Sequence, residues 1–217
     1  GRHTLPWQAN RDPYRIWLSE IMLQQTQVAS VIPYFQRFIT HFPHLPSLAS
    51  ASQEAVLAQW SGLGYYSRAR NLHRAAQQLC DRHDGQFPQD IEALQSLPGI
   101  GRSTAAAIAA LAFGQTRAIL DGNVKRVLAR HAGIAGWPGD KAVEAQLWAL
   151  AEARLPTAGI EAYTQGMMDL GASICSRSRP KCAACPVSAD CVALQQGRVA
   201  ELQVQVDQGY PLVFQRG

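Results

Sequence analysis

Several features of other protein classes are missing from this sequence of 217 residues. No apolar run approaches the roughly 18 residues that a membrane-spanning helix needs, so we expect no membrane association. No signal peptide, internal repeat or low-complexity stretch is evident, which argues against an exported protein or a repeat array. Charged residues make up only 17% of the chain, and the formal net charge is +4. This mild positive excess permits nucleic acid binding without requiring it.

The chain can bury a core in one domain or two small ones, because 47% of its residues are hydrophobic. The cysteine usage and the missing signal fit a reducing cytoplasm. The first residues, GRHTLPW, include no initiator Met and read as if they begin within a longer protein.

Apolar residues recur at intervals of three and four along most of the chain, which predicts amphipathic helices. The first such stretch covers residues 16–42, with a break or kink expected at Pro33. No alternating strand pattern precedes residue 199, so the sequence predicts an all-α fold. The tail, residues 199–217, alternates weakly and is assigned no function. Further helices are predicted over residues 54–60, 68–82, 90–97, 103–113, 123–131, 140–155 and 163–175.

Four of the five cysteines lie close together, with the spacing C-x6-C-x2-C-x5-C. Four thiolates this near in sequence can meet on a metal centre, either a structural zinc ion or an iron–sulfur cluster. Two disulfides could use the same residues, but a chain of this size and apolar content does not need them. Cys80, the fifth, falls in a helical pattern and is expected in the core. The four are Cys175, Cys182, Cys185 and Cys191.

The loop between the first two of these cysteines is strongly basic. It carries Arg177, Arg179 and Lys181, which suggests an anchored loop that presents positive charge to phosphate.

The segment LPGIGRSTAAAIAAL, residues 97–111, has the helix-hairpin-helix pattern of non-specific DNA binders. Gly99 and Gly101 let the backbone turn sharply and approach a partner. Amides at the start of the second helix, near Ser103, then suit a phosphate. Alone, such a turn could simply separate two helices.

The segment LDGNVKRVLARH places Asp121 just before a helix, where the commonest role of Asp is an N-cap. It could instead face the same DNA groove as the hairpin. Lys125, Arg126 and Arg130 follow on the next helix, and we expect phosphate contacts or a solvated face there.

Glu20 lies in the apolar segment WLSEIMLQQTQV, so it is either paired in the core or functional. Partial burial would raise its pKa and suit a general acid. Gln24, Gln25 and Gln27 follow it, as amides able to bond base edges or as a polar helix face.

The segment GLGYYSRARNL places Tyr65 and Tyr66 in a turn before a basic helix. An aromatic side chain at a turn can wedge into a base stack, or it can pack onto the core. Arg68 and Arg70 are again expected to contact phosphate.

Together LSEIMLQQTQV, GLGYYSRARNLH, LPGIGRSTAAAI, ILDGNVKRVLAR and the four-cysteine loop resemble the helix-hairpin-helix DNA glycosylase superfamily. Within it they are similar to adenine DNA glycosylases of the MutY type, from about residue 5 to about residue 194. The resemblance implies two helical lobes with the active site in the cleft between them. A six-helix barrel lobe with the hairpin would cover residues 6–115, and an iron–sulfur lobe residues 1–5 and 116–198. It also favours a 4Fe–4S cluster over zinc on the four cysteines.

The resemblance implies removal of adenine mispaired with 8-oxoguanine or guanine in duplex DNA, after the adenine leaves the stack. Glu20 would protonate the adenine, and Asp121, with Asn123 orienting groups nearby, would stabilise the cationic sugar. Gln24 and Tyr65 would lie near the lesion strand, with Tyr65 wedging beside the oxidised base. Endonuclease III, a relative, places its catalytic Lys where this chain has Ser103, so the resemblance implies a monofunctional enzyme with little or no lyase activity.

Such proteins usually continue into a Nudix-like domain that recognises 8-oxoguanine, whereas this chain ends soon after the cysteine loop. We therefore expect a catalytic fragment or an altered gene. The resemblance also implies a monomer in the bacterial cytoplasm that acts at the nucleoid. Three alternatives stay open: a bifunctional endonuclease III-like glycosylase/lyase, a DNA-binding module without chemistry, and a zinc-stabilised scaffold with no DNA role.

Overall fold

The computed structural model describes residues 4–202, and all regular elements within that range are helical. The all-α prediction is therefore confirmed. Two compact units make up the chain, divided between Arg117 and Ala118. Leu5, which we predicted to belong to the second lobe, instead packs against the hydrophobic core of the first unit. No helix of the described range is both long and apolar enough to cross a membrane.

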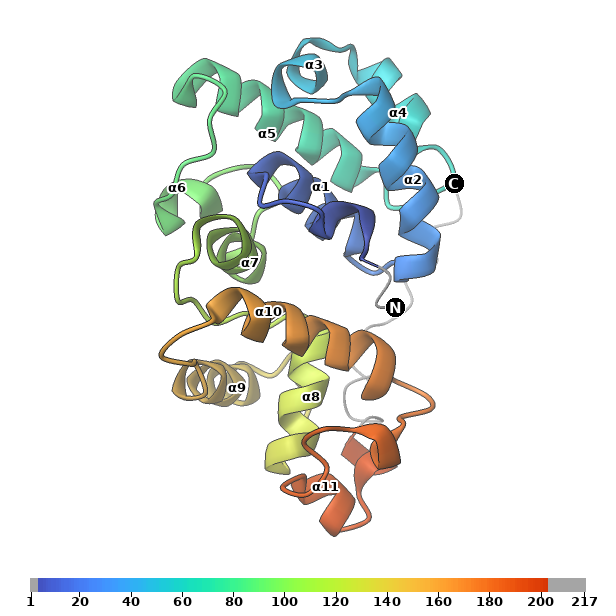
Figure 1. The fold of residues 1–217 in the computed structure, drawn as a ribbon, viewed down its shortest axis with the longest axis vertical. Coiled ribbons are helices and arrows are strands. Elements are labelled where there is room, and N and C mark those ends of the chain that lie inside the picture. The colour runs from blue at the N-terminus through green and yellow to red at the C-terminus, as the bar shows by residue number, and fades with distance from the viewer. Residues whose placement is uncertain (1–3, 203–217) are drawn as a thin grey trace. The chain divides into compact units, whose positions relative to one another are not determined.

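The first unit is built around α1 (Pro13–Leu23), which is packed by α2, α5 and α7 (Figure 1). Trp17 of α1 and Trp60 of α4 are fully buried in its core. The central position of α1 gives the residues on it a rigid support. The other helices are α2 (Val28–His41), α3 (Leu45–Ser50), α4 (Gln53–Trp60), α5 (Ser67–His83), α6 (Ile91–Gln95) and α7 (Arg102–Phe113), with a 3-10 turn at Pro6–Gln8.

The break in the predicted helix 16–42 falls at residues 24–27 and not at Pro33. The backbone of Gln25 adopts a left-handed conformation, with φ of 58°, which no helix can continue through. Pro33 instead lies inside α2, where its ring removes one backbone donor and the helix continues to His41. The expected break at Pro33 is therefore wrong.

The second unit is organised around α8 (Gly122–Ala132), which contacts each of its other main helices (Figure 1). The helix predicted over residues 163–175 begins earlier, at Ile160, and changes to a wider π-helix at Leu170–Ile174. In the tail, residues 199–202 are helical and Leu202 is buried, while residues 203–217 lie outside the described range. The remaining elements are α9 (Lys141–Ala153), α10 (Ile160–Asp169), a 3-10 turn at Cys182–Ala184, and α11 (Val192–Gln195).

Candidate functional site

Glu20 lies on the C-terminal half of α1 and is half-buried, flanked by the buried residues Ser19 and Ile21. The helix around it is held by the core, so the position of its carboxylate is set by α1. A carboxyl group partly shielded from water, yet accessible from outside, suits proton transfer to a bound ligand.

Asp121 is the N-cap of α8, where its carboxylate accepts the Val124 N–H at 2.8 Å. Burial raises the pKa of Asp121, while the N–H groups of Val124 and Asn123 and the cations of Arg126 and Lys125 act in the opposite direction. The capping role predicted from the sequence is thus confirmed. The same carboxylate is also poorly solvated, so its negative charge is weakly screened and would act strongly on a cation placed beside it.

Asn123, in the first turn of α8, is held by the guanidinium of Arg126. Arg126 Nη2 donates to Asn123 Oδ1 at 2.7 Å and to the Gly171 carbonyl at 2.6 Å. Its Nε donates to the Cys175 carbonyl at 2.8 Å. Gly171 must lack a side chain, because a Cβ there would lie 2.7 Å from Asn123 Cβ. Arg126 therefore ties the start of α8 to the π-helix and the first cysteine, and the prediction of a phosphate contact or solvated face is wrong for it.

Arg130 and Lys125 also have structural roles on α8. Arg130 is 1% exposed and donates to the Ser176 carbonyl at 2.9 Å and to Cys175 Sγ at 3.4 Å. The ammonium of Lys125 lies 3.4 Å from the Glu144 carboxylate on α9. Because Arg130 is buried, the prediction of a phosphate contact or solvated face is wrong for this residue as well.

The four predicted metal ligands are half-buried and form no disulfide. Burial is the main cause that raises the pKa of Cys182, and the other three clustered thiols add to it while Arg130 lowers it. Each of the other three thiols therefore influences the pKa of Cys182. Within residues 4–202, no group of three or more His, Cys, Asp or Glu side chains forms a metal-ion site as it stands. Cys80 is partly buried beside the core of the first unit, as predicted.

Three of the predicted phosphate ligands lie in the loop between the first two cysteines. Arg177, Arg179 and Lys181 are all exposed. The loop is held in place because the Lys181 N–H donates to the Ile174 carbonyl at 2.9 Å. Its positive charges are thus presented to solvent from an anchored segment.

The predicted hairpin is formed by α6, a turn at residues 96–101, and α7. Gly99 has a φ of 77° and a Cβ there would lie 3.1 Å from Asn71 Cβ, so glycine is needed for both reasons. Gly101 has neither constraint, because its φ is −86° and nothing lies within 4 Å of a Cβ placed there, so its close approach to a partner stays a prediction. As the N-cap of α7 it offers no side-chain acceptor, so the first N–H groups of α7, near the half-buried Ser103, suit an anion.

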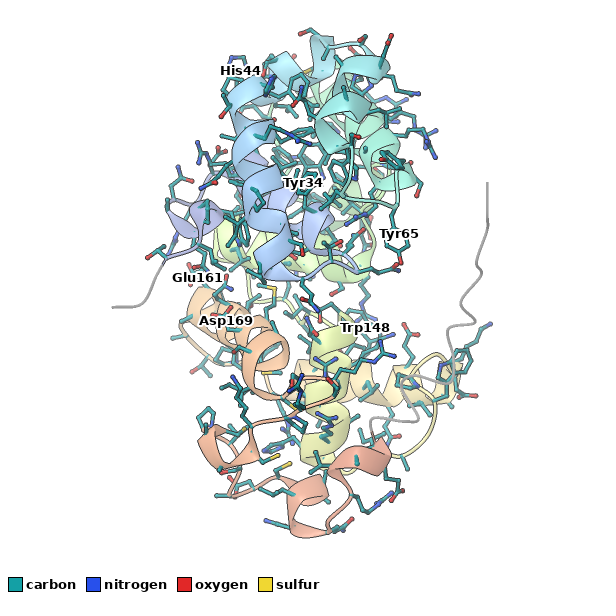
Figure 2. All side chains as sticks on the ribbon, turned by 90° about the vertical axis from the view of Figure 1, so that its right-hand side faces the viewer. Tyr34, His44, Tyr65, Trp148, Glu161 and Asp169 are labelled. Carbon is teal, nitrogen blue, oxygen red and sulfur yellow. The ribbon has the colours of Figure 1, made fainter. Side chains whose placement is uncertain are left out.

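Two exposed side chains predicted to meet DNA lie on loops of the first unit. Tyr65 is 61% exposed at the surface of this unit (Figure 2). Gln25 is exposed on the segment that follows α1. Gln24 beside it is half-buried, and its Nε2 donates to Thr104 Oγ1 on α7 at 3.3 Å. The structure therefore joins the glutamine segment to the hairpin helix.

Arg68, predicted to contact phosphate, is 8% exposed, and its guanidinium bonds backbone carbonyls inside the first unit. That prediction is wrong for Arg68, whereas Arg70 is exposed. The sequence contains a signal for this burial. Arg68 is spaced from Leu72 and Leu79 by four and eleven residues, which places it on the buried face of α5.

The chain matches a model of a known protein family. The model described as "HhH-GPD superfamily base excision DNA repair protein" matches residues 18–153. An adenine DNA glycosylase of Buchnera aphidicola subsp. Acyrthosiphon pisum is 49% identical over 89% of this chain and 55% of its own length. The human protein of that name is 44% identical over 90% of this chain and 37% of its own length. The chain thus spans about half or less of these curated relatives.

Solved structures agree with this assignment. A thermostable thymine-DNA glycosylase superimposes with a TM-score of 0.77 and 29% identity, over 90% of both chains. An endonuclease III–DNA complex gives a TM-score of 0.75 at 23% identity, over 90% of this chain and 89% of the other, and shows the shared fold. The chain therefore belongs to the HhH-GPD superfamily of base excision DNA repair proteins.

Proposed function

We propose that this chain is the catalytic part of an adenine DNA glycosylase, which hydrolyses the N-glycosidic bond of adenine opposite 8-oxoguanine or guanine. The observation that carries the proposal is the desolvated carboxylate of Asp121 at the start of α8, in a chain 49% identical to a protein named adenine DNA glycosylase. The half-buried Glu20 on α1 supplies the second carboxyl group that the chemistry needs. The bacterial relatives favour chromosomal DNA of a bacterium as the substrate, and we propose that the protein acts as a monomer.

In the proposed reaction, Glu20 donates a proton to the ring of an adenine that has left the base stack. The bond between the sugar C1′ and the base then breaks, and its electron pair stays with the adenine. Asp121 stabilises the cationic sugar through its charge, because a poorly solvated carboxylate exerts a strong local field. A water molecule adds to C1′ and loses a proton, which leaves free adenine and an abasic site.

The residue at position 103 determines whether a lyase step can follow the hydrolysis. A lyase step needs an amine that forms a Schiff base with the opened sugar, and the hydroxyl of Ser103 in the first turn of α7 cannot form one. We therefore propose that the enzyme is monofunctional and leaves the DNA strand intact.

DNA binding in this proposal uses three parts of the chain. The uncapped first turn of α7 receives a phosphate through its N–H groups. The exposed basic loop between Cys175 and Cys182 adds long-range attraction to the backbone. Gln25 and Tyr65 enter the duplex beside the mispair.

The same four cysteines would hold a 4Fe–4S cluster. Their thiols fit such a group in chemistry, since four cysteines free of disulfides are the ligand set that a 4Fe–4S cluster takes. When bound, the cluster would cross-link the four cysteines and would take no redox part in the hydrolysis. Arg130 donates to Cys175 Sγ, and its cation would offset the negative charge of the thiolates.

The replacement Glu20→Gln tests the proposal, because glutamine keeps the size of the side chain but cannot donate an acidic proton. We expect the single-turnover rate of adenine release to fall by about 10²-fold or more, while the affinity for the duplex stays unchanged. Glu54→Gln, at an exposed site on α4, is the matched control and should leave the rate unchanged. Undiminished adenine release by the Glu20 variant would rule out this residue as the acid.

A further inference from the structure

Gln25 and Tyr65 share an unusual backbone conformation on two separate loops of the first unit. Their φ angles are 58° and 48°, in the left-handed region that residues other than glycine seldom adopt. Such strain persists only where the surrounding structure enforces it, and it gathers at functional positions. Both side chains are also exposed. Other groups of the first unit must therefore hold the backbone of both loops in this conformation.

On the first loop the holding group is the guanidinium of Arg68. Its Nη1 donates to the carbonyls of Ile21, Met22 and Gln24, at 3.0, 2.8 and 2.7 Å. These carbonyls lie at the C-terminal end of α1, where the helix dipole favours a cation and few backbone donors are available. Of the three carbonyls, that of Ile21 also accepts a backbone bond, from the Gln24 N–H at 3.3 Å. The last of them belongs to the residue directly before Gln25.

The second terminal nitrogen of the Arg68 guanidinium holds the second loop. Arg68 Nη2 donates to the Gly64 carbonyl at 3.2 Å, directly before Tyr65, and to Thr26 Oγ1 at 3.3 Å. The guanidinium carbon also lies 5.5 Å from the centre of the Tyr65 ring and 5.3 Å from that of Trp60. One buried side chain therefore contacts the residues before and after Gln25 and the residue before Tyr65.

We propose that Arg68 is a positioning residue that fixes these two loops to each other, so that Gln25 and Tyr65 enter a DNA duplex as one rigid unit. The planar fork of a guanidinium can bond two sets of acceptors at once, which a lysine ammonium of shorter reach cannot do. Insertion of both side chains rests on the proposed function, whereas the coupling of the loops in the free protein does not.

Hydrogen exchange on the DNA-free protein tests the coupling, with Arg68→Lys as the variant. We expect the backbone amides of residues 22–27 and those of residues 62–67 both to exchange about tenfold faster in the variant than in the wild type. Faster exchange in only one segment, or in neither, would overturn the proposal. This readout needs no DNA, so it stands or falls separately from the glycosylase activity.

Arg37→Lys is the matched control. Arg37 also donates to backbone carbonyls, those of Gln59 at 2.7 Å and Ser61 at 3.3 Å, and its guanidinium lies over the Tyr34 ring. None of these partners lies in residues 22–27, so the control should leave exchange there unchanged. Faster exchange in that segment would mean that any loss of a guanidinium loosens the unit.

The consequence for DNA is measured with 2-aminopurine placed beside the base opposite the adenine. Wild-type protein should raise its fluorescence on binding, as the wedge disrupts stacking, and Arg68→Lys should give a smaller rise. Single-turnover adenine release should fall by about 10- to 100-fold with a smaller change in Kd, as expected for misplaced contacts. An Arg68 variant with wild-type fluorescence and rate would overturn the proposal. Failure of the wild type to release adenine would instead refute the proposed function.

A milder variant covers the case in which Arg68→Lys does not fold. Thr26→Val removes the one hydroxyl of the first loop that accepts from Arg68. We expect exchange to rise about two- to fivefold in residues 22–27 and also in residues 62–67. An unchanged second segment would contradict the coupling.

Discussion

Arg126 gives a sharp test of how the start of α8 is held, because one buried guanidinium serves three acceptors. Replacing it with methionine keeps most of the apolar stem but removes every donor. The carbonyls of Gly171 and Cys175 and the amide oxygen of Asn123 then lose bonds of 2.6 to 2.8 Å. The perturbation is therefore confined to polar contacts.

The size of the effect follows from those contacts. Each buried acceptor left without its donor costs about 1–3 kcal/mol. Bonds to one group are not additive, so we expect a total near the cost of breaking one buried charged partner, about 3–5 kcal/mol. For a chain of this length that corresponds to a fall in Tm of roughly 6–20 °C.

Thermal and denaturant unfolding followed by circular dichroism would measure this change. Lys125→Met is the control on the same helix, since its half-exposed ion pair with Glu144 should contribute only about 0–1 kcal/mol. Adenine release by the Arg126 variant should also fall, because Asn123 loses the group that orients it. Equal losses of stability in the Arg126 and Lys125 variants would refute the reasoning.

Three further predictions concern the lyase step, phosphate contacts and the charge at Asp121. Ser103→Lys should introduce some strand nicking and borohydride trapping, since it restores an amine; a wholly inert variant would weaken the inference from residue 103. Arg177→Ala and Lys181→Ala should weaken binding to all duplex sequences and flatten its salt dependence, with a slope smaller by about 1 each; an unchanged slope counts against phosphate contact. Burial raises the pKa of Asp121, so its contribution to stability is present below the ordinary pKa of 3.8 and lost as pH rises through the folded value. Asp121→Asn keeps the cap, so we expect it to abolish activity, to raise Tm at pH 7 and to leave Tm unchanged at pH 3. The control Asp140→Asn, at the exposed cap of α9, should not raise Tm at pH 7. Equal gains in Tm for the two variants would contradict the raised pKa of Asp121.

Much of the fold follows from sequence because its signals are local. Helical periodicity, the cap at Asp121 and the glycine turn at Gly99 act within a few residues, and the structure has each of them. The break after α1 was misplaced, because the left-handed conformation of Gln25 depends on a guanidinium 43 positions later in the chain, at Arg68. A local pattern contains no information about such a contact.

The buried arginines show the same limit at the candidate site. A basic residue beside a DNA-binding motif is usually read as a phosphate ligand, and for Arg68, Arg126 and Arg130 this was wrong. Their donors instead satisfy backbone carbonyls of other segments, which only the fold reveals. The positions of Glu20 and Asp121 on α1 and α8, in contrast, were predicted from motifs alone.

The central claim is tested most directly with a duplex that holds one adenine opposite 8-oxoguanine. After incubation with the protein, half of each sample is treated with hot alkali and both halves are resolved on a denaturing gel. The account predicts cleavage at the adenine only in the alkali-treated half, because an abasic site forms without a strand break. Cleavage without alkali would contradict the monofunctional assignment, and no cleavage despite tight binding would contradict the glycosylase itself.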